Sequence, residues 1–126
     1  MKKQTITIKT GTADEFFKRG RILAKAADRG ERLPAECIVS FEDPADVMRL
    51  VTETRLKVFR TLKERPGSIT DLSVRLHRDR SAVKRDIDEL ARAGLVIIDE
   101  KVLPGHGRMK EVRVAAACFR LQADVI

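Results

Sequence analysis

The chain has 126 residues, of which 43% are hydrophobic and 36% charged, and its formal net charge is +7. This length predicts one small domain or one domain with an extension, and the apolar fraction excludes a fully disordered chain. The sequence contains five Phe but no Trp or Tyr, which argues against a fold that stacks bases on aromatic platforms. Since no apolar run approaches the roughly 18 residues of a membrane span and no secretory signal begins the chain, we expect a cytoplasmic protein without membrane contact.

The first third of the chain predicts a strand, a helix and a second strand. Thr5–Thr10 alternates polar and aliphatic side chains and is rich in β-branched residues, which is typical of a strand. Thr12 and Glu15 have the spacing of a capping box, so a helix begins there and continues to about Asp28. Residues 37–41 are a second strand candidate with imperfect alternation.

Two further helices are predicted in the middle of the chain. One begins at Pro44, because proline is favoured in the first turn of a helix. The next is capped by Thr52 or Thr54 and is ended by Pro66 and Gly67.

The following stretch predicts two short helices joined by a turn. Thr70 is the expected N-cap of a helix over 71–76, and a turn follows. Asp79 or Ser81 is the expected cap of the second helix, over about 80–93. Its inner face is formed by three aliphatic residues at positions i, i+4 and i+7: Val83, Ile87 and Leu90.

A hairpin is predicted after the second short helix. Residues 95–98 are an apolar strand, 103–110 a loop with Gly105 and Gly107, and 111–114 an alternating strand that returns. The tail, 115–126, is compatible either with an extension of this returning strand or with a small helix. Cys118 in that tail is expected to be a small core residue.

This order of elements resembles the MarR-like winged-helix DNA-binding domains. The resemblance is carried by TETRL at 52–56, ITDLSVRL at 69–76, RDRSAVKRDIDEL at 78–90 and AGLV at 93–96. The whole chain is also similar to a bacterial and archaeal group of candidate transcriptional regulators, whose genes are often found beside small toxin-like genes. The resemblance implies an α+β fold, in which a winged helix-turn-helix domain carries a small N-terminal β-α-β extension, and it implies a DNA-binding regulator.

The charge distribution agrees with this implication. Residues 44–126 have a net charge of +5 and twelve arginines, whereas residues 1–43 have a net charge of +2. Five bases and one acid occur within 75–85, and arginine is suited to bidentate contacts with phosphate and guanine. A solvated helix face is the plainer explanation of such a run.

The second short helix, over about 80–93, is the predicted recognition helix. Its candidate DNA contacts follow when its aliphatic face is placed inward. The N-terminal half of such a helix meets base edges in the major groove. We therefore expect Arg85 and Ser81 to contact bases and Arg80 and Lys84 to contact both bases and phosphates. Other contacts to phosphate or to the minor groove are expected from the turn, the short helix and the wing 103–110. The complete predicted set is Thr70, Arg78, Arg80, Ser81, Lys84, Arg85, His106, Arg108 and Lys110.

These interpretations assign different roles to two parts of the chain. Residues 44–126 are expected to be the DNA-binding domain, and 1–43 an extension for dimerisation or partner binding. We expect a homodimer on double-stranded DNA that acts as a transcriptional regulator, most simply a repressor. Two alternatives remain: an antitoxin that also binds a toxin protein, and a winged helix used only for protein contacts.

Other kinds of site have little support in the sequence. His77, His106, Cys37 and Cys118 lack the close spacing of zinc ligands. No local signature of a nucleophile and its base occurs, and the two glycines of the loop are not in the strand-to-helix context of a phosphate loop. We therefore expect no enzyme activity, cofactor or metal.

Overall fold

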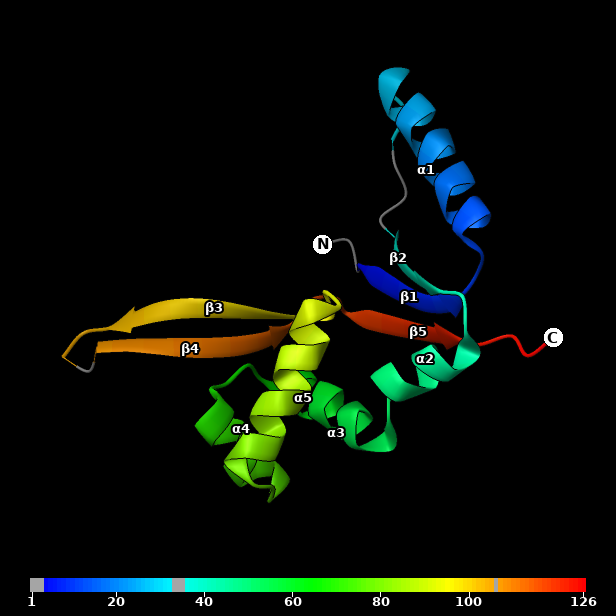
Figure 1. Cartoon of the computed structure of the whole chain (residues 1–126). Helices are drawn as coiled ribbons and strands as arrows, with labels where there is room; N and C mark the ends of the chain where they lie inside the picture. The colour runs from blue at the N-terminus through cyan, green and yellow to red at the C-terminus, as the bar shows by residue number, and fades with distance from the viewer. Residues whose placement is uncertain (1–3, 33–35, 106) are drawn as a thin grey trace. The chain divides into compact units, whose positions relative to one another are not determined.

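The computed structural model describes residues 4–32, 36–105 and 107–126 (Figure 1). The fold is α+β, and the chain forms two compact units, Met1–Arg49 with Cys118–Ile126 and Leu50–Ala117. The elements in chain order are β1 (Thr5–Thr10), α1 (Ala13–Asp28), β2 (Glu36–Phe41), α2 (Pro44–Leu50), α3 (Glu53–Glu64), α4 (Ile69–Leu76), α5 (Arg80–Arg92), β3 (Val96–Leu103), β4 (Gly107–Val114) and β5 (Cys118–Gln122).

The first unit is built on a three-stranded parallel sheet in the order β2-β1-β5. The register places Cys37 of β2 and Phe119 of β5 on either side of Ile6 in the central strand. Ile6 and Ile8 are buried, as the alternation of the sequence predicts, and Thr7 between them is buried as well. Two parallel strands need a crossover connection, and α1 supplies it between β1 and β2.

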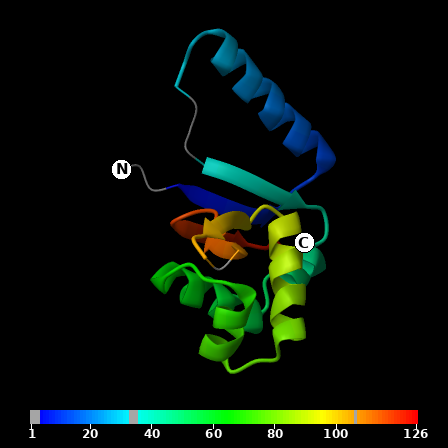
Figure 2. The ribbon, with the colours of Figure 1, turned by 90° about the vertical axis from the view of Figure 1, so that its left-hand side faces the viewer.

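The helix α1 begins and ends where the sequence predicts. The Thr12 hydroxyl accepts a hydrogen bond from the backbone N–H of Glu15 (3.1 Å), and the Glu15 carboxylate accepts one from the backbone N–H of Thr12 (3.4 Å). Gly30, with φ of 70°, lies just past its C-terminal end. None of the described residues of α1 is buried, and Figures 1 and 2 show the helix extending away from the sheet.

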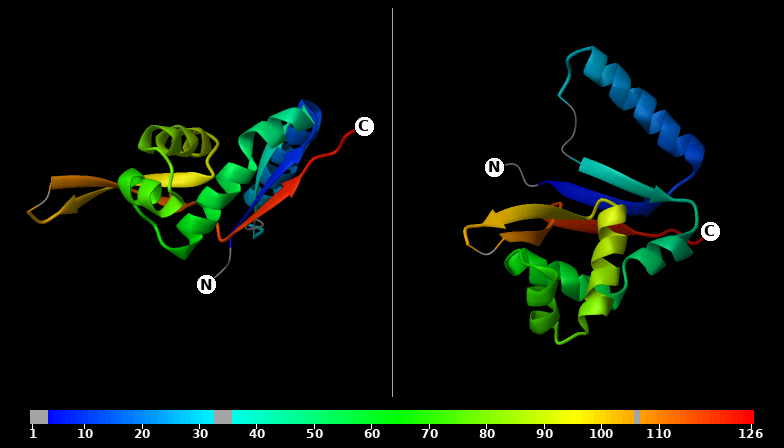
Figure 3. Two further views of the ribbon diagram at one scale, coloured as in Figure 1. Left: turned by 90° about the horizontal axis from the view of Figure 1, so that it is seen from below. Right: turned by 60° about the vertical axis from the view of Figure 1, so that its left-hand side comes forward.

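The second unit is a winged helix-turn-helix. The helices α3, α4 and α5 surround a common core, and the β3–β4 hairpin projects past α4 (Figure 3). Gly67, between α3 and α4, exchanges two backbone hydrogen bonds with Val112 of β4 (3.1 and 2.8 Å), which attaches the hairpin to the helices. The core consists of side chains that are buried or nearly so: Val58, Phe59, Leu62, Leu72, Val83, Ile87, Leu90, Leu95, Val96 and Val112.

Several predicted boundaries are wrong. The helix α4 begins at Ile69 rather than at 71, because the N-cap is Ser68, whose hydroxyl accepts from the N–H of Asp71 (3.0 Å), and not Thr70. The strands of the hairpin are longer than predicted, since backbone pairing continues to Leu103 and Gly107, so the loop is confined to its tip.

The tail also differs from what the sequence predicts. It contributes β5, which pairs with β1 and so belongs to the first unit rather than to the expected domain 44–126. The first boundary falls at Arg49 instead of residue 43. Cys118, expected in the core, is exposed at the sheet edge. No helix in the described part of the chain is long and apolar enough to span a bilayer.

Candidate nucleic-acid interface

The helix α5 presents one aliphatic face to the core and one polar face to solvent. Val83, Ile87 and Leu90 are completely buried, whereas Ser81, Lys84 and Arg85 are exposed. The N-cap of the helix is Asp79, whose carboxylate accepts a hydrogen bond from the N–H of Ser81 (3.2 Å). The buried stripe thus fixes which side chains of α5 are available to a ligand.

A left-handed residue turns the chain between α4 and α5. His77 has φ of 53° and ψ of 44°, and its backbone N–H bonds to the carbonyl of Val74 (3.3 Å). The N–H of Arg78 bonds to the carbonyl of Ser73 (3.0 Å). A non-glycine residue with positive φ is uncommon, and here it allows a connection of only three residues between α4 and α5.

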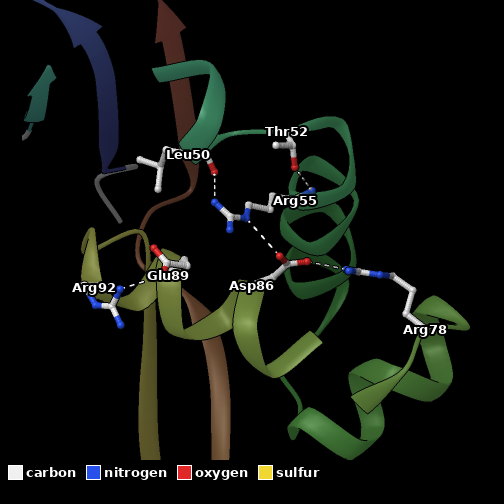
Figure 4. Close-up of polar contacts among 7 residues, drawn as sticks. All are labelled: Leu50, Thr52, Arg55, Arg78, Asp86, Glu89 and Arg92. Carbon is white, nitrogen blue, oxygen red and sulfur yellow. Dashed lines mark hydrogen bonds and ion pairs between the residues drawn. The ribbon is translucent and has the colours of Figure 1, made fainter. Parts of the chain in front are cut away.

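Asp86 on the flank of α5 holds two arginines at once (Figure 4). Its carboxylate lies 2.7 Å from Nη1 of Arg78 and 3.3 Å from Nε of Arg55, and Nη1 of Arg55 donates to the carbonyl of Leu50 (2.8 Å). The side chains of Asp86 and Arg55 are each only 14% exposed. This network connects α3, the turn and α5, so the guanidinium of Arg78, predicted to contact phosphate, is held by Asp86 and its side chain is mostly buried.

The basic run within 75–85 therefore divides into internal and exposed members. Arg75 is also internal, since its guanidinium donates to the carbonyls of Thr61 (2.6 Å) and Arg65 (3.1 Å) and contacts Asp71. Arg80, Lys84 and Arg85 are exposed on α5. The Nζ of Lys84 lies 2.8 Å from the carboxylate of Asp88, an exposed pair whose stabilising contribution is small.

The exposed bases of α5 share a groove with the N-terminus of α4 and with the wing. The groove has a volume of about 420 Å³. Within it, Nε of Arg80 donates to the hydroxyl of Thr70 (3.1 Å), which steadies the guanidinium across the two helices. None of the described residues that line the groove is acidic. They are Ser68, Ile69, Thr70, Arg80, Lys84, Arg108, Met109 and Lys110.

The wing carries its cations on a strand. Arg108 and Lys110 lie on β4, where the period of two places them on the same face as the buried Val112. Gly105 and Gly107 have φ of 80° and 76°, conformations that favour glycine, and they allow the tight turn at the hairpin tip. His106, the remaining predicted wing residue, lies outside the described residues.

The groove suits a ligand with negative charge along its length. Four side-chain cations converge there, and the first-turn N–H groups of α4 border it, where a helix favours an anion. Ser81 and Arg85 extend the same polar face along α5. The geometry therefore offers phosphate contacts beside side chains that have donors for base edges.

Five of the eight residues that line the groove are among the DNA contacts predicted from the sequence: the four cations and Thr70. The sequence analysis missed the other three, Ser68, Ile69 and Met109. The signal for Ser68 is present, because Ser68 and Asp71 have the spacing of a helix start. Met109 has no such signal, since its place in the groove depends on how the hairpin lies against α4.

A metal site is not evident in the described ranges, where no group of three or more His, Cys, Asp or Glu side chains is arranged to hold an ion. Two small hollows of the first unit, of about 280 and 140 Å³, lie beside the residues that follow β1 and β2. Neither hollow contains a basic or histidine side chain among its described lining residues.

Comparison with known proteins gives a family and several structural likenesses. The family model described as HVO_A0114 matches residues 50–117, which is more than half of the chain. A comparison with curated protein sequences found no match.

Among solved structures, the chain is similar to a possible transcriptional regulator from Methanosarcina mazei Go1 (23% identity, TM-score 0.48), over 58% of this chain and 66% of that one. It is also similar to HlyU from Vibrio cholerae N16961 (24%, 0.46), over 59% of this chain and 77% of that one. A third likeness is ZitR from Lactococcus lactis in complex with DNA (16%, 0.46), over 82% and 65% of the two chains. The chain thus spans slightly less than two thirds of the Methanosarcina protein's length.

Proposed function

The chain belongs to the HVO_A0114 family, and from its cationic groove and the outer face of α5 we propose that it is a sequence-specific regulator of transcription that binds double-stranded DNA. The observation that carries this proposal is the convergence of Arg80, Lys84, Arg108 and Lys110 in one groove at the start of α4 and α5. Duplex DNA is favoured over single strands because the described lining of this groove contains no aromatic ring for base stacking.

In the proposed complex, α5 enters the major groove with its N-terminal half. Arg85 and Ser81 contact base edges, and Arg80 and Lys84 lie between bases and phosphates. Arg108 and Lys110 hold the wing on the backbone or beside the minor groove. Thr70, which steadies Arg80 and lies in the first turn of α4, contributes its backbone N–H to a phosphate.

Arg78 has a positioning role in this proposal. Its ion pair with Asp86 fixes the turn against α5 and so sets the angle at which the helix is presented. A homodimer would present two such helices to half-sites about one helical turn apart. Occupation of a promoter by this dimer excludes other proteins from it, so we propose a repressor of the MarR-like kind.

We expect Arg85→Ala to weaken binding to a specific duplex by about 1–3 kcal/mol, because a bidentate contact to a guanine edge is lost. Binding to a random duplex should change little. The measurement is a fluorescence anisotropy titration of both duplexes at one salt concentration. Arg92→Ala is the matched control, since Arg92 is an exposed arginine at the C-terminal end of the same helix. Equal losses on the two duplexes would contradict base recognition by Arg85.

The antitoxin alternative has one observation in its favour, the exposed apolar side chains of α1, which are not needed for contact with DNA. An antitoxin would bind DNA through the same groove and hold its toxin on the first unit. Co-expression with the product of a neighbouring short gene, followed by purification on a tag at one of the two chains, distinguishes the cases. A stable complex favours the antitoxin, and two separate proteins favour the regulator alone.

A further inference from the structure

Two of the four groove cations have an acidic partner just outside the groove. The Nζ of Lys84 lies 2.8 Å from the carboxylate of Asp88, one turn further along α5. Nη1 of Arg108 on β4 lies 3.9 Å from the carboxylate of Glu100 on β3. Neither acid is among the described residues that line the groove. The cationic surface proposed to bind DNA is therefore partly neutralised by the protein itself.

The register of the hairpin places Glu100 beside a second groove cation as well. Glu100 is directly opposite Lys110, so their Cβ atoms are about 5 Å apart on one face of the hairpin. Arg108 lies two residues from Lys110 along β4 and therefore on the same face. One carboxylate thus lies beside both groove cations of the wing.

Local structure favours neither acid. Aspartate is a weak helix former, and in the pair of Lys84 with Asp88 the base precedes the acid, which is the less favourable order along a helix. Glutamate is depleted in β-strands, where Glu100 lies. The side chains of Asp88 and Glu100 are 43% and 55% exposed, and exposed ion pairs contribute little to stability. The two acids thus have a small effect on the fold and a direct effect on the charge of the groove.

We propose that Asp88 and Glu100 limit the affinity of the groove for the phosphates of any DNA sequence. This inference rests on the proposed function and concerns the strength of its phosphate contacts. In the free protein each acid holds one groove cation. In the complex a phosphate replaces the acid at that cation, while the carboxylate stays nearby and repels the DNA. Since phosphate contacts carry no sequence information, weaker ones leave the base contacts of α5 a larger share of the binding energy.

Two double variants with the same composition test the proposal. The groove variant combines Asp88→Asn with Glu100→Gln, and the control variant combines Glu89→Gln with Asp99→Asn. Each variant exchanges one Asp for Asn and one Glu for Gln, so the net charge of each rises by two from +7. The variants therefore differ only in where the two negative charges are removed.

The acids of the control variant are sequence neighbours of the first two but have different partners. The carboxylate of Glu89 lies 2.8 Å from Nη1 of Arg92 on α5. The carboxylate of Asp99 lies 2.8 Å from Nε of Arg113, on the face of the hairpin opposite to that of Glu100. Neither arginine is among the described residues that line the groove. The comparison therefore separates a local effect on the groove from an effect of net charge.

We expect the groove variant to bind a random duplex about ten times more tightly than the wild-type chain at physiological salt. Each removed acid adds one net positive charge beside the DNA, so the slope of log K against log salt concentration should become steeper by about 1 to 2. The control variant should stay within about threefold of the wild-type affinity, because salt screens exposed charges that are distant from the phosphates. Anisotropy titrations at several salt concentrations measure both quantities.

A gain in the groove variant that does not exceed the gain in the control variant would overturn the proposal. The proposed function fails in a different way. If the groove variant gains affinity as expected but the wild-type chain selects no motif from random duplexes, the sequence-specific regulator is refuted and the role of the two acids stands. If the wild-type chain selects a motif but the two variants bind the random duplex alike, only the role of the acids is refuted. A chain that binds no duplex even at low salt would refute both.

Discussion

Replacing Asp86 with asparagine will lower the free energy of unfolding of the winged helix by about 2–3 kcal/mol. The substitution keeps the shape of the side chain but removes the charge that Arg55 and Arg78 share, and two guanidinium groups are then left mostly buried without their counterion. Loss of one partner of a buried ion pair costs more than the pair contributes, because the remaining charge stays desolvated. Urea unfolding followed by far-ultraviolet circular dichroism measures the effect, since the chain has no Trp or Tyr as a fluorescent probe.

The matched control for Asp86 is Glu89→Gln on the same helix. Glu89 also pairs with an arginine, Arg92 (2.8 Å; Figure 4), but its side chain is 43% exposed and that of Arg92 is 73% exposed. Exposed pairs contribute little, so the control should lose no more than about 0.5 kcal/mol. Similar losses for the two substitutions would mean that the Asp86 network does not hold the turn against α5.

Removal of all four groove cations should produce the largest change in DNA binding. We expect the combined variant Arg80→Ala, Lys84→Ala, Arg108→Ala and Lys110→Ala to bind duplex DNA about two to three orders of magnitude more weakly at physiological salt. Each phosphate contact contributes about 0.9 to the slope of log K against log salt concentration, so the slope should fall by about 3 to 4. Anisotropy titrations at several salt concentrations measure both quantities.

A second set of four exposed cations provides the control for net charge. Lys57, Arg60 and Lys63 lie on α3, and Arg92 lies at the end of α5, all outside the groove. Their combined replacement by alanine lowers the net charge equally but should change the slope by less than 1. If the two quadruple variants lose the same affinity, binding depends on net charge rather than on the groove.

Local signals account for the parts of the fold that the sequence predicts well. The capping box at Thr12 and the aliphatic face of α5 involve residues within one helix, where spacing alone determines the geometry. The order of the helices and strands in the winged helix follows from local signals of this kind. Ser68 and Thr70 both have side chains that are favoured as N-caps, so local preference does not decide between them. Which of the two caps α4 depends on how the preceding residues pack.

Non-local contacts account for what the sequence does not predict. The pairing of β5 with β1 joins residues more than a hundred positions apart, and no periodicity in the tail indicates it. The positive charge of the 75–85 run is visible in the sequence, but which of its bases are exposed is not. Arg75 donates a hydrogen bond to a backbone carbonyl of α3, and Arg78 forms an ion pair with Asp86. A count of charges treats these internal arginines like the exposed Arg80 and Arg85.

The absence of a partner for α1 within the described chain is likewise invisible to the sequence. The sequence predicts the start and the end of this helix, but only the structure shows that Phe16, Phe17 and Ile22 are exposed.

Selection of bound sequences from a random duplex pool tests the central claim most directly. The wild-type chain should enrich a two-fold symmetric motif whose half-sites are about one helical turn apart. The Arg85→Ala variant should enrich the same spacing with relaxed preference at one position of each half-site. An enriched pool indistinguishable from the starting pool at low salt would contradict the assignment of the groove and α5 as a sequence-specific DNA-binding surface.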